Sequence, residues 1–253
     1  MGLSDVLYGA YERRLSRSLD RTATPRHVGV MLDGNRRWAR ANGFETQDGH
    51  QAGADRIKDL LAWCEQAGVE LVTLWLLSTD NLGRDEDELT PLLRIIENAV
   101  ADLAAAHRWR LHPIGALELL PAATTEALRK AEEATADVRG LTVNVAVGYG
   151  GRREIADAVR HLLIEHAARG TPMEVLAKNV SVDEIASHLY TRGQPDPDLV
   201  IRTSGEQRLG GFLLWQSAAS EFYFCEAYWP DFRHVDFLRA LRSYATRERR
   251  FGR

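Results

Sequence analysis

Apolar and polar residues are arranged along the chain in blocks that predict strands separated by helices. Short unbroken apolar runs are typical of strands buried on both faces, and they occur at 28–32, 70–78, 141–149 and 198–202. Apolar residues at helical spacing mark the longer segments 50–67, 85–106 and 152–168. The alternation predicts an α/β fold: a single domain whose central, mostly parallel sheet is flanked by helices on both faces.

Weaker patterns complete this outline. They predict a strand at 108–115, a helical stretch at 117–138, a short helix at 182–190, an apolar helical stretch and a last strand within 212–232, and a basic helical tail at 235–249. The first residues repeat an apolar side chain every fourth position, which predicts an amphipathic helix over 3–20. We therefore expect a helical extension at residues 1–24 and one main domain at residues 25–253.

Composition places the chain among ordinary soluble globular proteins. Of its 253 residues, 45% are hydrophobic and 27% are charged, and the net charge of −4 does not favour nucleic-acid binding. Cys64 and Cys225 are isolated and fit no zinc spacing, which indicates a reduced, cytoplasmic setting. No signal-peptide core and no apolar run of membrane-spanning length is present, so we expect at most peripheral contact with a membrane.

Candidate chemistry follows three of the predicted strands, at the point where each ends. These segments are Asp33-Gly34-Asn35-Arg36-Arg37, Ser78-Thr79-Asp80-Asn81 with Arg84 close behind, and Arg202-Thr203-Ser204-Gly205-Glu206 with Arg208 close behind. The carboxyl ends of parallel strands open on one edge, so these side chains should converge there. Arginine matches phosphate oxygens, and a lone carboxylate suits Mg²⁺ shared with a diphosphate. We therefore expect a transferase site for two phosphorylated substrates.

Each of these segments also has a simpler interpretation. A single arginine is more often a solvated surface charge, and residues 33–35 could be only a structural turn and helix cap. The acidic run at 85–88 fits the first turn of a helix better than a metal site. No GxxxxGK[ST] loop and no DDxxD pair is present. An aspartyl phosphatase would suit residues 32–35, but Met31 stands where its second aspartate is expected.

Four blocks together resemble the signature motifs of cis-prenyltransferases, the undecaprenyl diphosphate synthase family. They are HVGVMLDGNRRWAR, LLSTDNLGR, VAVGYGGRREI and DLVIRTSGEQRLGGFLLWQSAASEFYF, in family order and spacing. The resemblance covers about residue 25 to the end and is greatest to short-chain Z-isoprenyl diphosphate synthases. It implies a six-stranded, mostly parallel sheet, a homodimer, and condensation of isopentenyl diphosphate with an allylic diphosphate to form a Z double bond.

The resemblance also assigns residues to roles. Asp33 matches the catalytic aspartate that binds Mg²⁺, and Glu221 matches a second carboxylate linked to the metal. The residues that match the allylic diphosphate site are Gly34, Asn35, Arg36, Arg37, Trp38, His50, Ser78, Thr79, Asp80 and Arg84. Those that match the isopentenyl diphosphate site are Arg202, Arg208, Leu209, Gly210, Arg250 and Gly252, the last two in a tail that crosses the dimer.

Asn81 matches a residue that this family often credits with accepting the proton. Because an amide is a very poor base, we expect Asn81 to position substrate and a diphosphate oxygen to accept the proton. Three residues depart from the family pattern: Thr46 replaces an arginine, Leu82 a tryptophan and Gly210 a serine. We expect these changes to alter affinity rather than abolish the reaction.

Leu76 predicts the length of the product. Long-chain members commonly carry a small residue two positions before Ser78, and a leucine there should plug the tunnel that receives the growing chain. We therefore expect (2Z,6E)-farnesyl diphosphate made from geranyl diphosphate. The alternatives are that Leu76 is ordinary core, that the chain makes medium or long polyprenyl diphosphates, or that it is a non-catalytic subunit of a heteromeric prenyltransferase.

Overall fold

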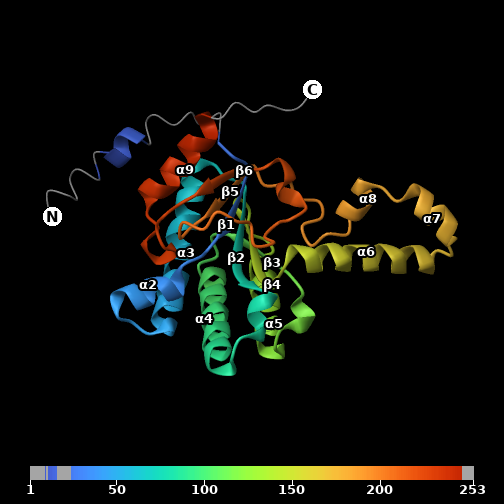
Figure 1. Cartoon of the computed structure of the whole chain (residues 1–253), viewed down its shortest axis with the longest axis horizontal. Coiled ribbons are helices and arrows are strands. Elements are labelled where there is room, and N and C mark those ends of the chain that lie inside the picture. Colours follow the sequence, from blue (N-terminus) through green and yellow to red (C-terminus); the bar gives the residue numbers. More distant parts are fainter. Residues whose placement is uncertain (1–8, 10, 16–23, 247–253) are drawn as a thin grey trace.

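The computed structural model describes residue 9, residues 11–15 and residues 24–246, and its centre is a single sheet (Figure 1). Six strands lie in the order β3-β4-β2-β1-β5-β6, and each neighbouring pair is parallel. The strands are β1 His27–Met31, β2 Leu71–Ser78, β3 Arg110–Ile114, β4 Thr142–Tyr149, β5 Leu199–Arg202 and β6 Glu221–Phe224. The predicted six-stranded α/β fold is confirmed, and the sheet is parallel throughout.

Helices connect successive strands from β1 to β5, and α9 follows β6. The α-helices are α2 Asn35–Asn42, α3 Thr46–Ala67, α4 Glu86–Ala105, α5 Ala122–Ala134, α6 Gly151–Ala168, α7 Met173–Asn179, α8 Val182–Ala186 and α9 His234–Thr246. Single 3-10 turns are η2 Asp80–Gly83, η3 Leu117–Leu119, η4 Gln216–Ala219 and η5 Trp229–Asp231. No described helix has the length and apolar character that a membrane crossing requires.

One face of the sheet carries most of the core. Side chains of alternate strand residues, such as Val28, Val30 and Leu74, pack there against α3, α4, α5 and α9. The helices contribute apolar stripes, for example Leu60 on α3 and Leu93 on α4, that are almost completely buried. Burial of this surface from water is the main stabilisation of the fold, and it also fixes α3 and α4 beside the strand ends.

The opposite face of the sheet is covered mainly by an irregular segment, residues 203–220. Phe212 and Leu213 pack there against Met31, Tyr149 and Val200. Gly29 makes this close approach possible, because a Cβ at position 29 would lie 3.0 Å from the Phe212 ring. The prediction of a helical stretch early in 212–232 is therefore wrong. Tight aromatic packing on β1 holds the segment in turns, and only the short η4 forms.

Helix α6 leaves the sheet and forms an arm with α7 and α8 (Figure 1). The helix predicted at 152–168 is confirmed, but its apolar residues are not all buried. Leu162 is buried, whereas Val159 and Leu163 are exposed by 36% and 40%. The reason is that the sheet ends before this part of α6, so its apolar side chains have no strand beneath them.

Two further differences concern short or terminal elements. Helix α7 was not predicted, and the helix expected at 182–190 is only the single turn α8. Most of the predicted 3–20 helix lies outside the described residues. Within them, residues 11–15 are helical, and Leu15 packs with Val235 and Leu238 of α9. The division at residues 24 and 25 stays a prediction.

Candidate active site

The site lies at the carboxyl edge of the sheet, around the end of β1. Strand β1 lies between β2 and β5, and Met31 is aligned with Trp75 on one side and with Arg202 on the other. Because all three strands run in the same direction, the segments that follow them start side by side. The predicted convergence of the three polar segments is confirmed.

Two glycines allow α2 to begin directly at this edge. Gly34 has a φ of 107°, and a Cβ there would lie 2.8 Å from the Tyr228 ring. The start of α2 packs directly on Gly49 of α3. A Cβ at position 49 would lie only 2.3 Å from the Asn35 carbonyl oxygen, so a larger residue would not fit there. No side chain of the described residues caps the first turn of α2. Its N–H groups and positive dipole end therefore face the strand ends, as an anion requires.

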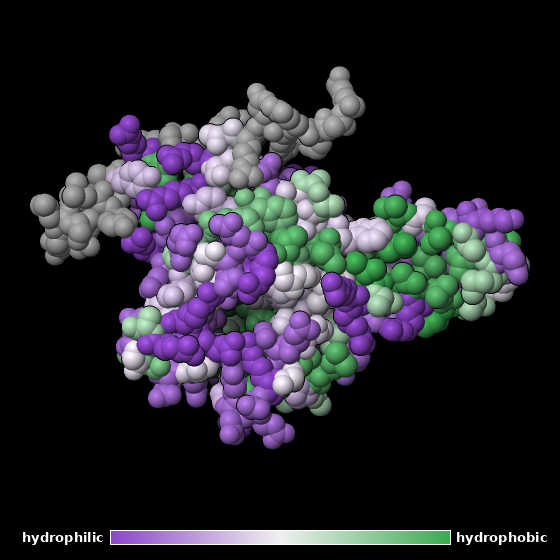
Figure 2. Space-filling model, viewed as in Figure 1, coloured by the Kyte–Doolittle hydropathy of each residue, from purple (hydrophilic) through white to green (hydrophobic). Residues whose placement is uncertain are grey.

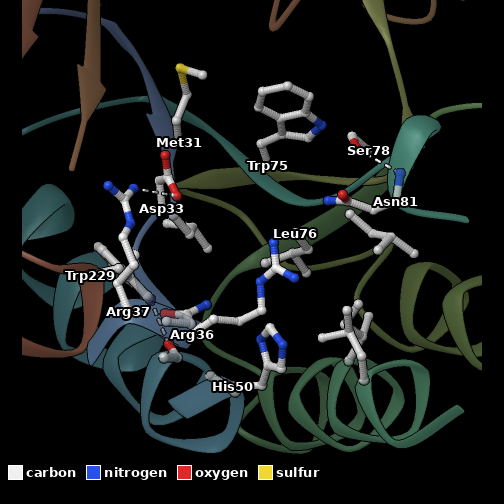
Figure 3. Close-up of a pocket in the computed structure, with 18 of the residues that line it drawn as sticks. Met31, Asp33, Arg36, Arg37, His50, Trp75, Leu76, Ser78, Asn81 and Trp229 are labelled. Carbon is white, nitrogen blue, oxygen red and sulfur yellow. Dashed lines mark hydrogen bonds and ion pairs between the residues drawn. The ribbon is translucent and has the colours of Figure 1, made fainter. Parts of the chain in front are cut away.

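A cavity of about 650 Å³ opens between these segments (Figure 3). Its polar part is lined by residues that include Asp33, Gly34, Asn35, Arg36, Arg37, His50, Ser78, Asn81, Arg84, Arg202, Arg208 and Gly210. Its apolar part is lined by Ala54, Ile57, Leu76, Leu77, Leu92, Ile95, Ile96, Ala99 and Trp229. The charged end suits diphosphates, and the apolar end, between β2, α3 and α4, suits a hydrocarbon chain.

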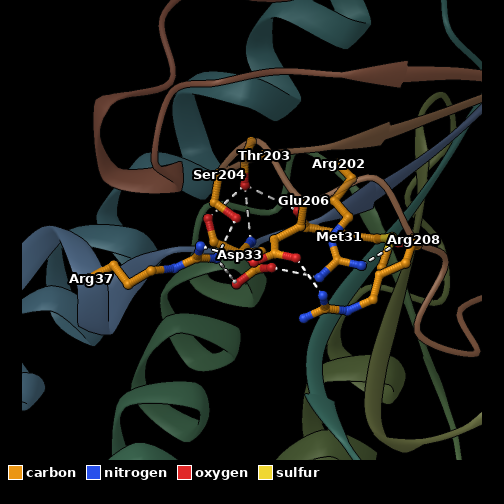
Figure 4. A network of polar contacts seen from close by, with 8 residues as sticks. All are labelled: Met31, Asp33, Arg37, Arg202, Thr203, Ser204, Glu206 and Arg208. Carbon is orange, nitrogen blue, oxygen red and sulfur yellow. Dashed lines mark hydrogen bonds and ion pairs between the residues drawn. The ribbon is translucent and has the colours of Figure 1, made fainter.

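Asp33 is held between two arginines at the centre of the polar part (Figure 4). Its Oδ2 accepts from Arg202 Nη2 at 2.8 Å, and its Oδ1 lies 3.3 Å from Arg37 Nη2. Burial alone would raise the pKa of this carboxyl, but the hydrogen bond and charge of Arg202, with that of Arg37, hold the pKa below its usual value. Asp33 is therefore ionised at neutral pH, as a metal ligand must be.

Glu206 is a second carboxylate beside Asp33. It binds Arg37 Nη1 at 3.2 Å, and its other oxygen accepts from Arg208. Arg37 also donates to Ser204 Oγ at 2.6 Å. The arginines from α2 and from the β5 segment are thus linked through Asp33 and Glu206 into one network, drawn in Figure 4. A phosphate group placed among them would meet several guanidinium groups at once.

A second group of charges lies beside the first, between α2, α3 and α4. Glu88 Oε1 is 2.7 Å from Arg84 Nη1, 3.6 Å from Arg36 Nη1 and 3.8 Å from His50 Nε2. Burial, with the positive charges of Arg84 and Arg36, lowers the pKa of His50 to about 4. His50 is therefore a neutral imidazole at the cavity wall, and Figure 3 shows it beside Arg36.

The loop after β2 is shaped by backbone contacts. Ser78 Oγ accepts from the Asn81 N–H at 3.1 Å, and the Thr79 N–H donates to the Tyr149 carbonyl at 3.1 Å. Ser78, Asn81 and Arg84 line the cavity, as the resemblance implied. Asp80 is exposed and Thr79 packs against Gly150, so neither lines it. Leu82, which departs from the family pattern, packs against the main core.

Three other residues assigned from the resemblance do not line the cavity. Trp38 packs instead on Phe44, with ring centroids 5.5 Å apart, because Ala39 and not Trp38 lies on the buried face of α2. Leu209 lies beside the lining residues Arg208 and Gly210 without joining them. Glu221 is aligned with Leu199 at the amino end of β5. It therefore lies at the edge of the sheet opposite to Asp33, and one chain does not bring these two carboxylates together.

The interpretation of the sequence missed two residues of the site. Trp229 lines the apolar part, and its indole N–H donates to the Gly53 carbonyl at 2.7 Å. Glu88 was interpreted only as part of an acidic helix start. Its spacing of four from Arg84 was a signal for the ion pair, because the first turn of α4 brings Glu88 back toward the residue just before the helix N-cap. Arg250 and Gly252 lie outside the described residues.

The residues present fit Mg²⁺ only as an ion shared with a substrate. Among the residues that the structure describes, no cluster of three or more His, Cys, Asp or Glu could hold a metal. Asp33 offers one ionised carboxylate beside the arginines. Mg²⁺ is commonly bound by one or two carboxylates together with substrate phosphates and water, and Asp33 can supply the protein's part.

Comparisons with known proteins agree with this site. Residues 31–252 match the family described as "Putative undecaprenyl diphosphate synthase". The chain is 64% identical to "(2Z,6E)-farnesyl diphosphate synthase" of Thermobifida fusca (strain YX), over 100% of each chain. It is 54% identical to the protein of the same name from Mycobacterium tuberculosis (strain ATCC 25618 / H37Rv), covering 99% of this chain and 97% of that one.

A solved structure shows the same fold. Lavandulyl diphosphate synthase from Lavandula x intermedia, in complex with dimethylallyl diphosphate, superposes with a TM-score of 0.85 at 35% identity. The match covers 92% of this chain and 100% of that one. These similarities cover the sheet, its helices and the segments that form the cavity, and the chain therefore belongs to the undecaprenyl diphosphate synthase family of cis-prenyltransferases.

Proposed function

We propose that the chain condenses isopentenyl diphosphate with geranyl diphosphate and forms (2Z,6E)-farnesyl diphosphate and pyrophosphate. The observation that carries this proposal is the form of the cavity, which joins a network of arginines around Asp33 to an apolar end lined in part by Leu76 and Leu77. The relatives named for (2Z,6E)-farnesyl diphosphate synthesis support the same product.

The two substrates would use different arginines. The allylic diphosphate would lie at the N-terminus of α2, near Arg36, Arg84 and His50, with its hydrocarbon in the apolar end. The isopentenyl diphosphate would lie on Arg202 and Arg208. Arg37, next to Arg36 on α2, links the two groups, because it contacts Asp33 and Glu206, the partners of Arg202 and Arg208. This arrangement would place the two reacting carbons near Asp33, and proximity of this kind accelerates reaction.

The chemistry then needs charge stabilisation more than a nucleophile. The bond between C1 and the diphosphate oxygen of the allylic substrate breaks, and pyrophosphate leaves. The double bond of isopentenyl diphosphate attacks C1 through C4, and a proton is lost from C2 of the added unit. Arginine side chains and N–H groups of α2 stabilise the charge on the leaving group.

Asp33 would hold Mg²⁺, which when bound supplies positive charge to the diphosphate of the allylic substrate. Asn81 lies at the cavity wall with its backbone fixed by Ser78. It would orient the isopentenyl unit through its amide, and a diphosphate oxygen would accept the proton, since an amide is too weak a base for that role.

The depth of the apolar end is set in part by Leu76. Between Trp75 and Leu77 the pairing of β2 with β4 shifts register, and Leu76 has no partner in the ladder. This irregularity places Leu76 and Leu77 together on the cavity wall, although consecutive strand residues ordinarily point to opposite faces. Two adjacent leucines would therefore limit the space for a longer chain.

Asp33→Asn tests the catalytic assignment. The substitution keeps the shape of the side chain and removes the charge that binds metal and orders Arg37 and Arg202. We expect turnover to fall ~10²–10³-fold, which is typical for the loss of one electrostatic group in a transition state. The assay measures transfer of labelled isopentenyl units to product, with geranyl diphosphate as the primer and Mg²⁺ present. Circular dichroism shows that the variant is folded.

The control for this variant is Asp137→Asn, which removes the same charge from a side chain that is 80% exposed. Its turnover should equal that of the wild type. Wild-type turnover in Asp33→Asn would remove Asp33 from the mechanism.

Leu76→Ala tests the limit on chain length. The smaller side chain should admit further isoprene units, because each methylene that can be buried gains ~0.8 kcal/mol. We expect a distribution shifted to longer products under the same primer concentration, measured by chromatography of the dephosphorylated alcohols.

Leu111→Ala on β3 is the control, since Leu111 is a buried leucine of the core, against which Leu76 also packs, and it does not line the cavity. It should lower the stability of the fold without lengthening the product. An Leu76→Ala protein that folds and stops at the wild-type length would show that Leu76 is ordinary core.

We infer that a second copy of the chain covers the arm. Exposed apolar side chains gather on α6, α7 and α8, where Figure 2 shows a green surface. They are Val159, Leu163, Ile164, Met173, Val175, Val180 and Val182. A patch of this kind on a projecting element marks an interaction surface. The proposed homodimer also gives the predicted tail residues Arg250 and Gly252 a partner site to reach.

Ile164→Glu tests this interface. Ile164 is 60% exposed on α6, so a charge there should not disturb the fold of one chain, but it would be buried in the dimer. We expect the dimer dissociation constant to rise about tenfold or more, as for truncation of an interface hot spot. Sedimentation equilibrium measures it. Leu119→Glu, at an exposed site on η3, is the control; equal dissociation constants in the two variants would place the interface elsewhere.

A further inference from the structure

Glu88 lies where three positively charged or titratable side chains of the cavity meet. Its Oε1 contacts Arg84 of the loop after β2, Arg36 of α2 and His50 of α3, at 2.7, 3.6 and 3.8 Å. These three contacts tie the start of α4 to α2, to α3 and to the loop that precedes α4. Glu88 lies in the first turn of α4, and later residues of the same helix line the apolar part of the cavity.

Arg36 and Arg84 lie close enough to repel each other, and Glu88 offsets part of this repulsion. Burial, and next the charge of Arg36, lower the pKa of Arg84, and Glu88 acts in the opposite direction. His50 Nε2 is buried and has no hydrogen-bond partner among the described residues, although it faces Glu88. Glu88 therefore neutralises part of the charge of Arg36 and Arg84 and leaves His50 unsatisfied.

We propose that Glu88 is a positioning residue that competes with the allylic diphosphate for Arg36 and Arg84. This inference rests on the proposed function, because it takes these arginines as diphosphate ligands. A diphosphate that binds Arg36 and Arg84 must replace the Glu88 carboxylate, and the same carboxylate can return to the arginines when pyrophosphate leaves. Glu88 would thus weaken diphosphate binding and speed its release.

The ion pairs of Glu88 are weak enough for a diphosphate to replace them. The Glu88 side chain is 26% exposed and that of Arg84 is 17% exposed, so water screens the pair in part. A fully buried pair would be costly to open, since it leaves two unpaired charges. A diphosphate carries more negative charge than one carboxylate, and its oxygens can also reach His50 Nε2.

The test measures binding of inorganic pyrophosphate to purified protein by isothermal titration calorimetry at fixed ionic strength. Glu88→Gln keeps the length of the side chain and removes the competing charge. We expect it to bind pyrophosphate about tenfold more tightly than the wild type, as removal of one nearby like charge predicts. The KM for geranyl diphosphate should fall in the same variant, while kcat does not rise.

Glu86→Gln is the matched control. Glu86 lies in the same first turn of α4 and is exposed, and its removal changes the net charge equally. Its affinity for pyrophosphate should equal that of the wild type. Tighter binding in Glu86→Gln of the same size would overturn the inference, because the effect would then come from net charge alone.

Weaker or unchanged binding in folded Glu88→Gln would also overturn it, and would show that Glu88 only orients the arginines. Both results leave the proposed function standing, because the wild type still binds pyrophosphate. A wild type that binds no pyrophosphate would contradict the proposed function itself. The two failures are therefore distinguishable in one experiment.

Discussion

The concentration of arginines at one edge of the sheet is the constraint on which the site depends. Six arginines line one cavity, and their positive charges repel one another: Arg36, Arg37, Arg40, Arg84, Arg202 and Arg208. Carboxylates of the chain compensate this charge: Asp33 between Arg37 and Arg202, Glu206 between Arg37 and Arg208, and Glu88 beside Arg36 and Arg84. On the proposed function, a diphosphate would replace these carboxylates as partner of the arginines, and its affinity would be the difference between two sets of ion pairs.

The parallel sheet makes this concentration possible and also separates it from the hydrocarbon. Strands β2, β1 and β5 end side by side, so charged segments from distant parts of the sequence meet at one edge. The apolar part of the same cavity lies between β2, α3 and α4, where the sheet carries its main core. The register shift at Leu76 occurs on β2, the strand that contributes to both parts of the cavity: Leu76 lines the apolar part, and Ser78 at the strand end lines the polar part.

The fold and the centre of the site could be predicted because they depend on local patterns and on one general rule. Buried strands show as apolar runs, and parallel strands place their carboxyl ends together, so Asp33, Arg84 and Arg202 could be expected to meet. The position of Glu221 could not be predicted in this way. It is the first residue of β6, and only the pairing with Leu199 shows that it lies at the opposite edge from Asp33.

Other features depended on contacts that no periodicity reveals. Trp38 packs on the Phe44 ring and does not line the cavity. Leu163 is exposed because the sheet does not extend beneath the arm. Glu88 had a signal in its spacing from Arg84, but its approach to Arg36 and His50 depends on how α2, α3 and α4 pack. Tertiary packing decided each of these positions.

The most direct measurement is the structure of the product made from geranyl diphosphate and labelled isopentenyl diphosphate by the purified wild-type protein with Mg²⁺. Chromatography against the geometric isomers of farnesol, after removal of the diphosphate, identifies both chain length and double-bond geometry. The proposed function, with Leu76 limiting the apolar end, predicts one dominant fifteen-carbon product with a new Z double bond, (2Z,6E)-farnesol. A product with an E double bond, a series of long polyprenols, or no incorporation with any allylic primer would contradict it.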